Sequence, residues 1–180
     1  MLMDPAISAA LALSLAALFA ATAAHKAVDF GRFISVVRAY GVMPAFLAPL
    51  ASLMVIALEF AIAAGLVAPP FRAVAGSSAA ALLLAYGVLI GFNIARNRRD
   101  IDCGCSFGGS GERLTPVLIF RNLGLAILAL VTAAPVGARS LELLDAASIT
   151  LFVLSSAALY VAFEGLRANA ARLYAAGGSR

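Results

Sequence analysis

Long uncharged stretches alternate with short polar stretches along this chain. Five stretches are apolar enough to be helices that cross a lipid bilayer, at about 5–25, 44–67, 73–95, 115–138 and 146–164. A helix needs about 20 mostly apolar residues to cross the roughly 30 Å of hydrocarbon. Each stretch therefore predicts a transmembrane helix, and the last is the shortest. The stretches are continuous and rich in Ala and Leu, which favours helices over the alternating strands of a barrel.

The composition supports a protein that lies in lipid. Hydrophobic residues make up 63% of the chain, charged residues make up 12%, and the mean hydropathy is +1.02. A soluble domain has about 25% charged residues, so this chain has too few charges to cover a surface that faces water. We therefore expect an all-α, polytopic integral membrane helical bundle with four core transmembrane helices and a fifth, forming a single domain over residues 1–180.

The first polar segment contains a short amphipathic stretch. Residues 28–43 mix Asp29, Arg32 and Arg38 with aromatic and β-branched residues. This mixture is typical of a helix in the membrane interface, and an ordinary connecting helix fits it equally well. The stretch at 5–25 has no basic residues before it, unlike a cleaved signal peptide, so we expect it to remain as the first helix.

The basic residues are unevenly distributed between the predicted loops. Ten of the thirteen lie in segment 26–38, in loop 96–115 or after the fifth helix, whereas Arg72 and Arg139 lie in the remaining loops. Cytoplasmic loops carry the excess of Lys and Arg. The bias predicts an outside N-terminus and a cytoplasmic C-terminus, and it places loop 96–115 in the cytoplasm. The pI of about 9.6 therefore reflects membrane orientation, and we expect no nucleic-acid partner.

Two charged residues lie inside the apolar stretches. Glu59 interrupts the second stretch and Arg121 interrupts the fourth. Charges within a membrane usually face the protein interior or a cavity, and their opposite signs suggest that the two residues form a pair. A structural pair that fixes helix packing is the favoured interpretation. The functional alternative is a proton or quinone site.

Both cysteines lie in loop 96–115. This loop also holds four arginines and, besides Gly104 of Cys103-Gly104-Cys105, three further glycines. A structural zinc site needs four ligands, which two cysteines and a single histidine do not supply, so we expect no metal. Inert cysteines are normally buried among apolar residues, unlike these two.

The third interpretation, beside inert structural cysteines, is a redox pair. The flanking arginines favour the thiolate form, which Asp102 opposes. Gly104 lets the chain bend enough for the two sulfurs to meet, and a strained or exposed disulfide exchanges readily. Cys103 and Cys105 are therefore the candidate catalytic residues, although the residues alone do not decide whether the protein is an enzyme.

Several motifs resemble the MauE family of methylamine-utilization membrane proteins, which is related to DoxX-like membrane proteins. The resemblance rests on Arg38 to Pro44 (RAYGVMP), Leu58-Glu59, Arg99 to Cys105 (RDIDCGC) and Arg121 to Leu123 (RNL), in this order. Together these motifs cover most of the first 135 residues, and Cys-Gly-Cys is the most specific. The chain departs from the family pattern Cys-Gly-Cys-Phe-Gly at Ser106.

The resemblance implies a role in the bacterial inner membrane, in maturation of periplasmic methylamine dehydrogenase. It implies disulfide formation in, or processing or transport of, the disulfide-rich small subunit, beside a thioredoxin-like partner (MauD-like). A periplasmic partner requires loop 96–115 to face the periplasm, in conflict with the arginine distribution.

Two alternatives stay open. One is a membrane scaffold or export helper without catalysis. The other is a DoxX-like, quinone-linked thiol oxidoreductase with Glu59 and Arg121 as cofactor-binding residues. No cofactor is expected, and a quinone is possible, either in this second alternative or as a direct reactant of the single cysteine pair.

Overall fold

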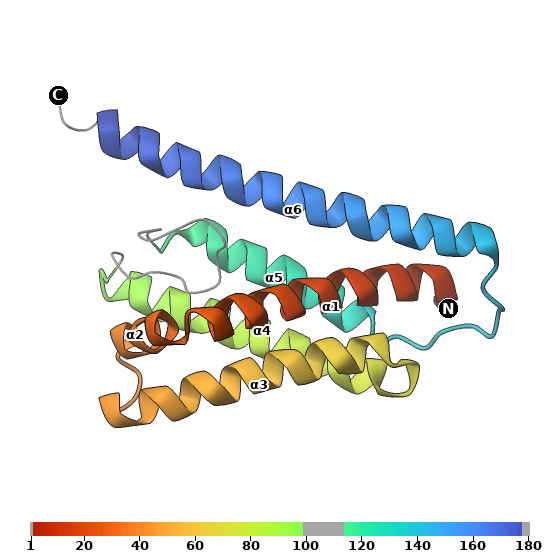
Figure 1. Ribbon diagram of the computed structural model, residues 1–180, viewed down its shortest axis with the longest axis horizontal. Coiled ribbons are helices and arrows are strands. Elements are labelled where there is room, and N and C mark those ends of the chain that lie inside the picture. Colours follow the sequence, from red (N-terminus) through yellow and green to blue (C-terminus); the bar gives the residue numbers. More distant parts are fainter. Residues whose placement is uncertain (1, 99–113, 178–180) are drawn as a thin grey trace.

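The structure, a computed structural model, describes residues 2–98 and 114–177 and is a bundle of helices (Figure 1). The helices are α1 (Pro5–Val28), α2 (Phe30–Tyr40), α3 (Ala48–Val67), α4 (Arg72–Ala95), α5 (Pro116–Val131) and α6 (Leu143–Gly177). Single 3-10 turns, Ala45–Leu47 and Pro69–Phe71, precede α3 and α4. Among the described residues no strand forms, so the predicted all-α membrane bundle is confirmed.

In the described part of the chain, four helical segments are long and apolar enough to cross a membrane. They are Pro5–Val28, Ala45–Val67, Pro69–Ala95 and Leu143–Leu166. With the shorter apolar helix α5, these segments run alternately in opposite directions (Figure 1). The end of α1, all of α2, the start of α3, the end of α4 and the start of α5 therefore lie at one end of the bundle, which we call the α2 end.

The predicted fourth and fifth helices differ from the structure. α5 has 16 residues and ends at Val131, seven residues before the predicted boundary at 138. At 1.5 Å per residue it is about 24 Å long, which is less than the hydrocarbon thickness. The predicted shortest helix is in fact the longest, because α6 begins at Leu143 and has 35 residues.

Local sequence signals set several helix ends. Asp4 caps α1 by accepting a hydrogen bond from the backbone N–H of Ala6 at 2.8 Å. Asp29 ends α1 and caps α2 by accepting from the N–H of Arg32. Gly41 ends α2 with a φ of +63°, a left-handed conformation that glycine adopts without steric cost. The segment predicted to be a short amphipathic helix is thus α2.

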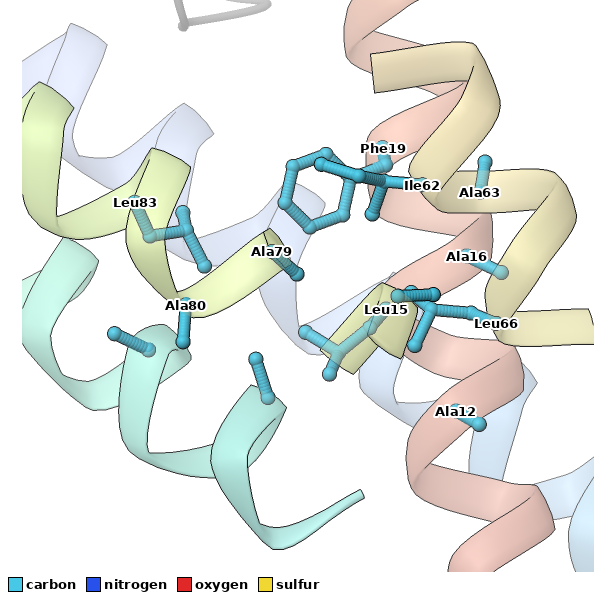
Figure 2. Close-up of a cluster of buried hydrophobic side chains, with 13 residues drawn as sticks. Ala12, Leu15, Ala16, Phe19, Ile62, Ala63, Leu66, Ala79, Ala80 and Leu83 are labelled. Carbon is cyan, nitrogen blue, oxygen red and sulfur yellow. The ribbon is translucent and has the colours of Figure 1, made fainter. Parts of the chain in front are cut away.

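Small residues dominate the main core, which joins α1, α3, α4 and α5 (Figure 2). Larger side chains fill the space between them, with Phe19 3% exposed and Leu66 fully buried. The small core residues are Ala12, Ala16, Ala63, Ala75, Ala79, Ala80, Ala126 and Ala129. Small side chains allow close approach of helices, which is the usual way that membrane helices associate.

The α4–α5 contact depends on glycine at one position above all. A Cβ on Gly76 would lie 2.7 Å from the carbonyl oxygen of Ala129 and would also overlap the Thr132 hydroxyl. The Gly87 and Gly91 positions, which form a GxxxG motif in α4, also face α5, with room for a Cβ at ordinary contact distance. Of these three glycines in α4, Gly76 therefore lies closest to α5.

α6 packs along α1. Ile149 lies against Ala9 and Ala10, and the Ser156 hydroxyl donates a hydrogen bond to the Ser14 hydroxyl at 3.1 Å. The other faces of α6 expose Leu and Phe side chains, as expected for a helix that contacts lipid.

Candidate functional site

Glu59 forms a buried salt bridge with Lys26, a residue that was expected only among the loop charges. The Lys26 ammonium, near the end of α1, donates to Glu59 Oε1 from α3, and both side chains are 2% exposed. Tyr86 of α4 also donates to Glu59 Oε1, at 2.8 Å. Three helices are therefore joined by one buried carboxylate oxygen.

The rings around Lys26 extend this site. Lys26 Nζ lies 5.2 Å from the centre of the Phe33 ring and 5.0 Å from that of the Tyr86 ring, distances at which aromatic faces attract a cation. A charged pair in a low-dielectric interior needs such additional contacts to offset its desolvation. Glu59 Oε2, in contrast, is buried without a hydrogen-bond partner among the described residues.

Arg121 forms a second ion pair, with Glu164. Its guanidinium donates to Glu164 Oε1 at 2.8 Å and to the Tyr160 hydroxyl at 3.3 Å. The side chains of Arg121 and Glu164 are 9% and 4% exposed. This pair connects α5 to α6, which otherwise packs mainly on α1.

The predicted direct pair of Glu59 with Arg121 is therefore wrong. Glu59 pairs with Lys26, and Arg121 pairs with Glu164. The sequence could not give these partners, since Lys26 and Glu164 lie at the ends of their apolar stretches, where charges are common. The two ion pairs nevertheless border one small cavity of about 30 Å³, which Asn122 also lines. A cavity of this volume is large enough to hold a water molecule.

A larger cavity lies at the α2 end, between α2, α3 and α4. Its volume is about 110 Å³, and we call it the α2 pocket. Among the residues that the structure describes, Lys26 is the only charged one that lines it. The other lining residues are apolar or aromatic: Phe33, Val36, Val37, Tyr40, Val42, Met43, Ala51, Val55, Tyr86, Leu89 and Ile90. No sequence pattern predicts this pocket, because its walls come from segments far apart in the chain.

The predicted redox residues Cys103 and Cys105 lie outside the described residues. The residues that flank their loop are fixed at the α2 end. Leu114, just before α5, is 1% exposed and belongs to a cluster with Val36, Tyr40, Ile90 and Leu118. After α4, the Arg98 guanidinium lies directly over Gly41, with Nη1 2.7 Å from the position that a Cβ would take there.

The chain matches one family model and several curated relatives. The model, described as methylamine utilisation protein MauE, matches residues 4–135. Methylamine utilization protein MauE of Paracoccus denitrificans is 38% identical over 132 residues, which are 73% of this chain and 71% of that protein. MauE of Methylorubrum extorquens is 35% identical over 129 residues, 72% of this chain and 69% of that protein. No solved structure matches the chain.

The matched range includes the whole of the Lys26–Glu59 ion pair and only one residue of the Arg121–Glu164 ion pair. It contains Lys26, Glu59, Arg121 and both cysteines, and it ends before α6 and Glu164. The pair between Lys26 and Glu59 thus lies wholly within the matched part, whereas the Arg121 pair joins the matched part to α6.

Proposed function

Because the chain belongs to the MauE family of methylamine utilisation proteins, we propose that it supports maturation of the small subunit of periplasmic methylamine dehydrogenase in the bacterial inner membrane. Its chemistry is thiol–disulfide exchange at Cys103 and Cys105 with a thioredoxin-like partner. The observation that supports this proposal most strongly is the family match over residues 4–135, which includes both cysteines. The fold, with several spans and a polar loop between α4 and α5, suits a membrane accessory protein.

The exchange needs only the two cysteines and the partner's thiols. A partner thiolate attacks one sulfur of the Cys103–Cys105 disulfide, which forms a mixed disulfide and releases the other cysteine as a thiolate. The partner's second thiolate then breaks the mixed disulfide. The partner loses two electrons and the cysteine pair gains them, and the same steps in reverse reduce the partner.

A double variant tests this function. Cys103→Ser with Cys105→Ser should abolish assembly of active methylamine dehydrogenase, while Ser106→Ala in the same loop should leave assembly intact. The readouts are dehydrogenase activity in the periplasmic fraction and the amount of oxidised small subunit. Normal assembly with the double variant would refute thiol exchange.

The side of the membrane is tested separately. Exchange with a periplasmic partner requires the cysteines to react in intact cells with a membrane-impermeant maleimide after treatment with a permeant reductant. Labelling only after the inner membrane is opened would contradict direct exchange.

The arginine distribution favours a second candidate function, a non-catalytic scaffold or export helper. It places loop 96–115 in the cytoplasm, away from a periplasmic thiol partner. For a scaffold, both cysteines tolerate replacement and show no change of redox state in cells. Normal assembly with the double variant would support this candidate.

A further inference from the structure

The α2 pocket has a volume comparable to that of a cavity that holds one aromatic ring. Its volume of about 110 Å³ is of the same order as the roughly 150 Å³ of an engineered apolar cavity that binds benzene. The pocket runs from the surface into the core, because Val42 on its lining is 43% exposed whereas Ile90 is 1% exposed. Substituents on a bound ring can therefore extend outward past Val42.

One wall of the pocket offers a single strong hydrogen-bond donor. The Lys26 ammonium has three N–H groups, and the described residues supply two acceptors for them, Glu59 Oε1 and the Tyr86 hydroxyl at 3.4 Å. The third N–H has no oxygen acceptor among the described residues and lies near the Phe33 and Tyr86 rings, so a ligand oxygen in the pocket can accept from it. An apolar pocket with one cationic donor selects an apolar molecule that carries a hydrogen-bond acceptor such as a carbonyl oxygen.

The pocket is adjacent to both ends of the cysteine-containing loop. Val36, Tyr40 and Ile90 line the pocket and also form the cluster that holds Leu114. On the other side of the loop, Arg98 lies over Gly41, directly before the pocket residue Val42. A ligand in the pocket would thus contact the same residues that anchor the loop.

We infer that the α2 pocket binds the head group of a membrane quinone, with Lys26 donating to a quinone carbonyl. The choice of a quinone rests on the proposed thiol exchange, since the chain has only two cysteines and no second pair to accept their electrons. This site differs from a site at Glu59 and Arg121, because Arg121 does not line the α2 pocket.

The quinone completes the electron balance of the exchange. The Cys103 and Cys105 thiols lose two electrons and two protons as the disulfide forms. The quinone gains two electrons and two protons and becomes the quinol, which leaves into the lipid. The disulfide is then ready to oxidise another partner.

Photolabelling of the purified full chain in nanodiscs tests the site directly. The probe is a short-tailed azido-ubiquinone, with decylubiquinone as competitor, and mass spectrometry identifies the labelled peptides. We expect labelling on α2, α3 or α4 around the pocket, and loss of this labelling with excess decylubiquinone.

Two variants of one helix separate the pocket from general partition into lipid. Ala51→Phe places a ring in the pocket and should weaken decylubiquinone competition at least roughly tenfold, whereas Ala57→Phe, at an exposed position on α3, should leave it unchanged. Lys26→Met should weaken competition by a similar factor, because a charge-assisted hydrogen bond is lost. Where Lys26→Met does not fold, Ala51→Phe decides the outcome.

The result that overturns the inference is labelling that is equal in the wild type and in Ala51→Phe, or that phospholipid displaces and decylubiquinone does not. The second pattern would show that an acyl chain occupies the pocket. Absent quinone binding together with failed dehydrogenase assembly in the double cysteine variant would reject the quinone site and leave the proposed function intact. Quinone binding together with normal assembly in that variant would reject the proposed thiol exchange and leave the quinone site intact.

Discussion

The Lys26 ammonium and the Glu59 carboxylate, 33 residues apart in the chain, form a salt bridge in the interior of the bundle. The contact fixes the end of α1 against the middle of α3, and Tyr86 adds α4 to the same oxygen. Because Lys26 also forms the polar wall of the α2 pocket, one residue connects the stability of the bundle with this apolar site.

Removing only one partner of this salt bridge should be strongly destabilising. Glu59→Leu leaves a buried ammonium without its counter-charge, and such changes cost about 3–5 kcal/mol. The double variant Lys26→Met with Glu59→Leu should recover much of this loss, since no unpaired charge remains. Unfolding of the detergent-solubilised protein measures both, with Glu142→Gln at an exposed position as the control. Equal losses in the single and double variants would mean that the two charges do not stabilise each other.

The turn after α2 should tolerate glycine far better than alanine. Gly41 has a φ of +63°, which costs an L-residue about 1–2 kcal/mol. Gly41→Ala should therefore lower the thermal unfolding temperature. Gly31→Ala, inside α2 and with no atom within 4 Å of its added Cβ, should be neutral or stabilising because alanine favours helix. A stabilising effect of Gly41→Ala would show that the turn has another conformation.

The close approach of α4 and α5 predicts a second glycine contrast. Gly76→Ala must push Thr132 and the Ala129 carbonyl away, and overpacking of this kind costs about 1–3 kcal/mol. Gly124→Ala on α5 meets no neighbour within 4 Å and should not destabilise the bundle. Thermal unfolding in detergent compares the two, and equal stability of both variants would argue against the observed contact.

The ion pair between Asp4 and Arg139 should make stability depend on pH. Arg139 donates to Asp4 at 3.1 and 3.2 Å, and this hydrogen bonding holds the pKa of Asp4 below its usual 3.8. A depressed folded pKa means that ionised Asp4 stabilises the fold above about pH 3.8, and that this stabilisation is lost as the pH falls through the lower folded value.

Asp4→Asn should therefore lower the unfolding temperature at pH 6, with the difference from the wild type shrinking below pH 3.8. Arg139→Gln should give the same pattern by removing the other partner. A difference that stays constant down to pH 3 would exclude the ion pair as its cause.

The apolar stretches predicted most of the fold, because helix length and lipid thickness are directly linked. The errors lie in the predicted boundaries of the last two helices, α5 and α6. Apolar residues continue after Val131, but Thr132 ends α5, and Met3 holds the following segment by hydrogen bonds with Pro135 and Gly137. These contacts join residues more than 130 positions apart, so no local sequence pattern predicts them.

The candidate site was predictable only in part. Glu59 and Arg121 are visible in the sequence because a charge within an apolar stretch needs an explanation. Their partners are not visible, since Lys26 and Glu164 lie where snorkelling to the membrane surface is an equally good expectation. The α2 pocket depends on how α2 packs against α3 and α4 and has no sequence signal of its own.

Trapping a mixed disulfide tests the proposed exchange most directly. The variants Cys103→Ser and Cys105→Ser each keep one reactive cysteine and remove the other, which would otherwise resolve the adduct. In cells that express the methylamine utilisation proteins, we expect one of the two variants to form a reductant-sensitive adduct with a thioredoxin-like protein on non-reducing gels, and the double variant to form none. Absence of an adduct in both single variants, with methylamine dehydrogenase assembled normally, would contradict thiol exchange by this protein.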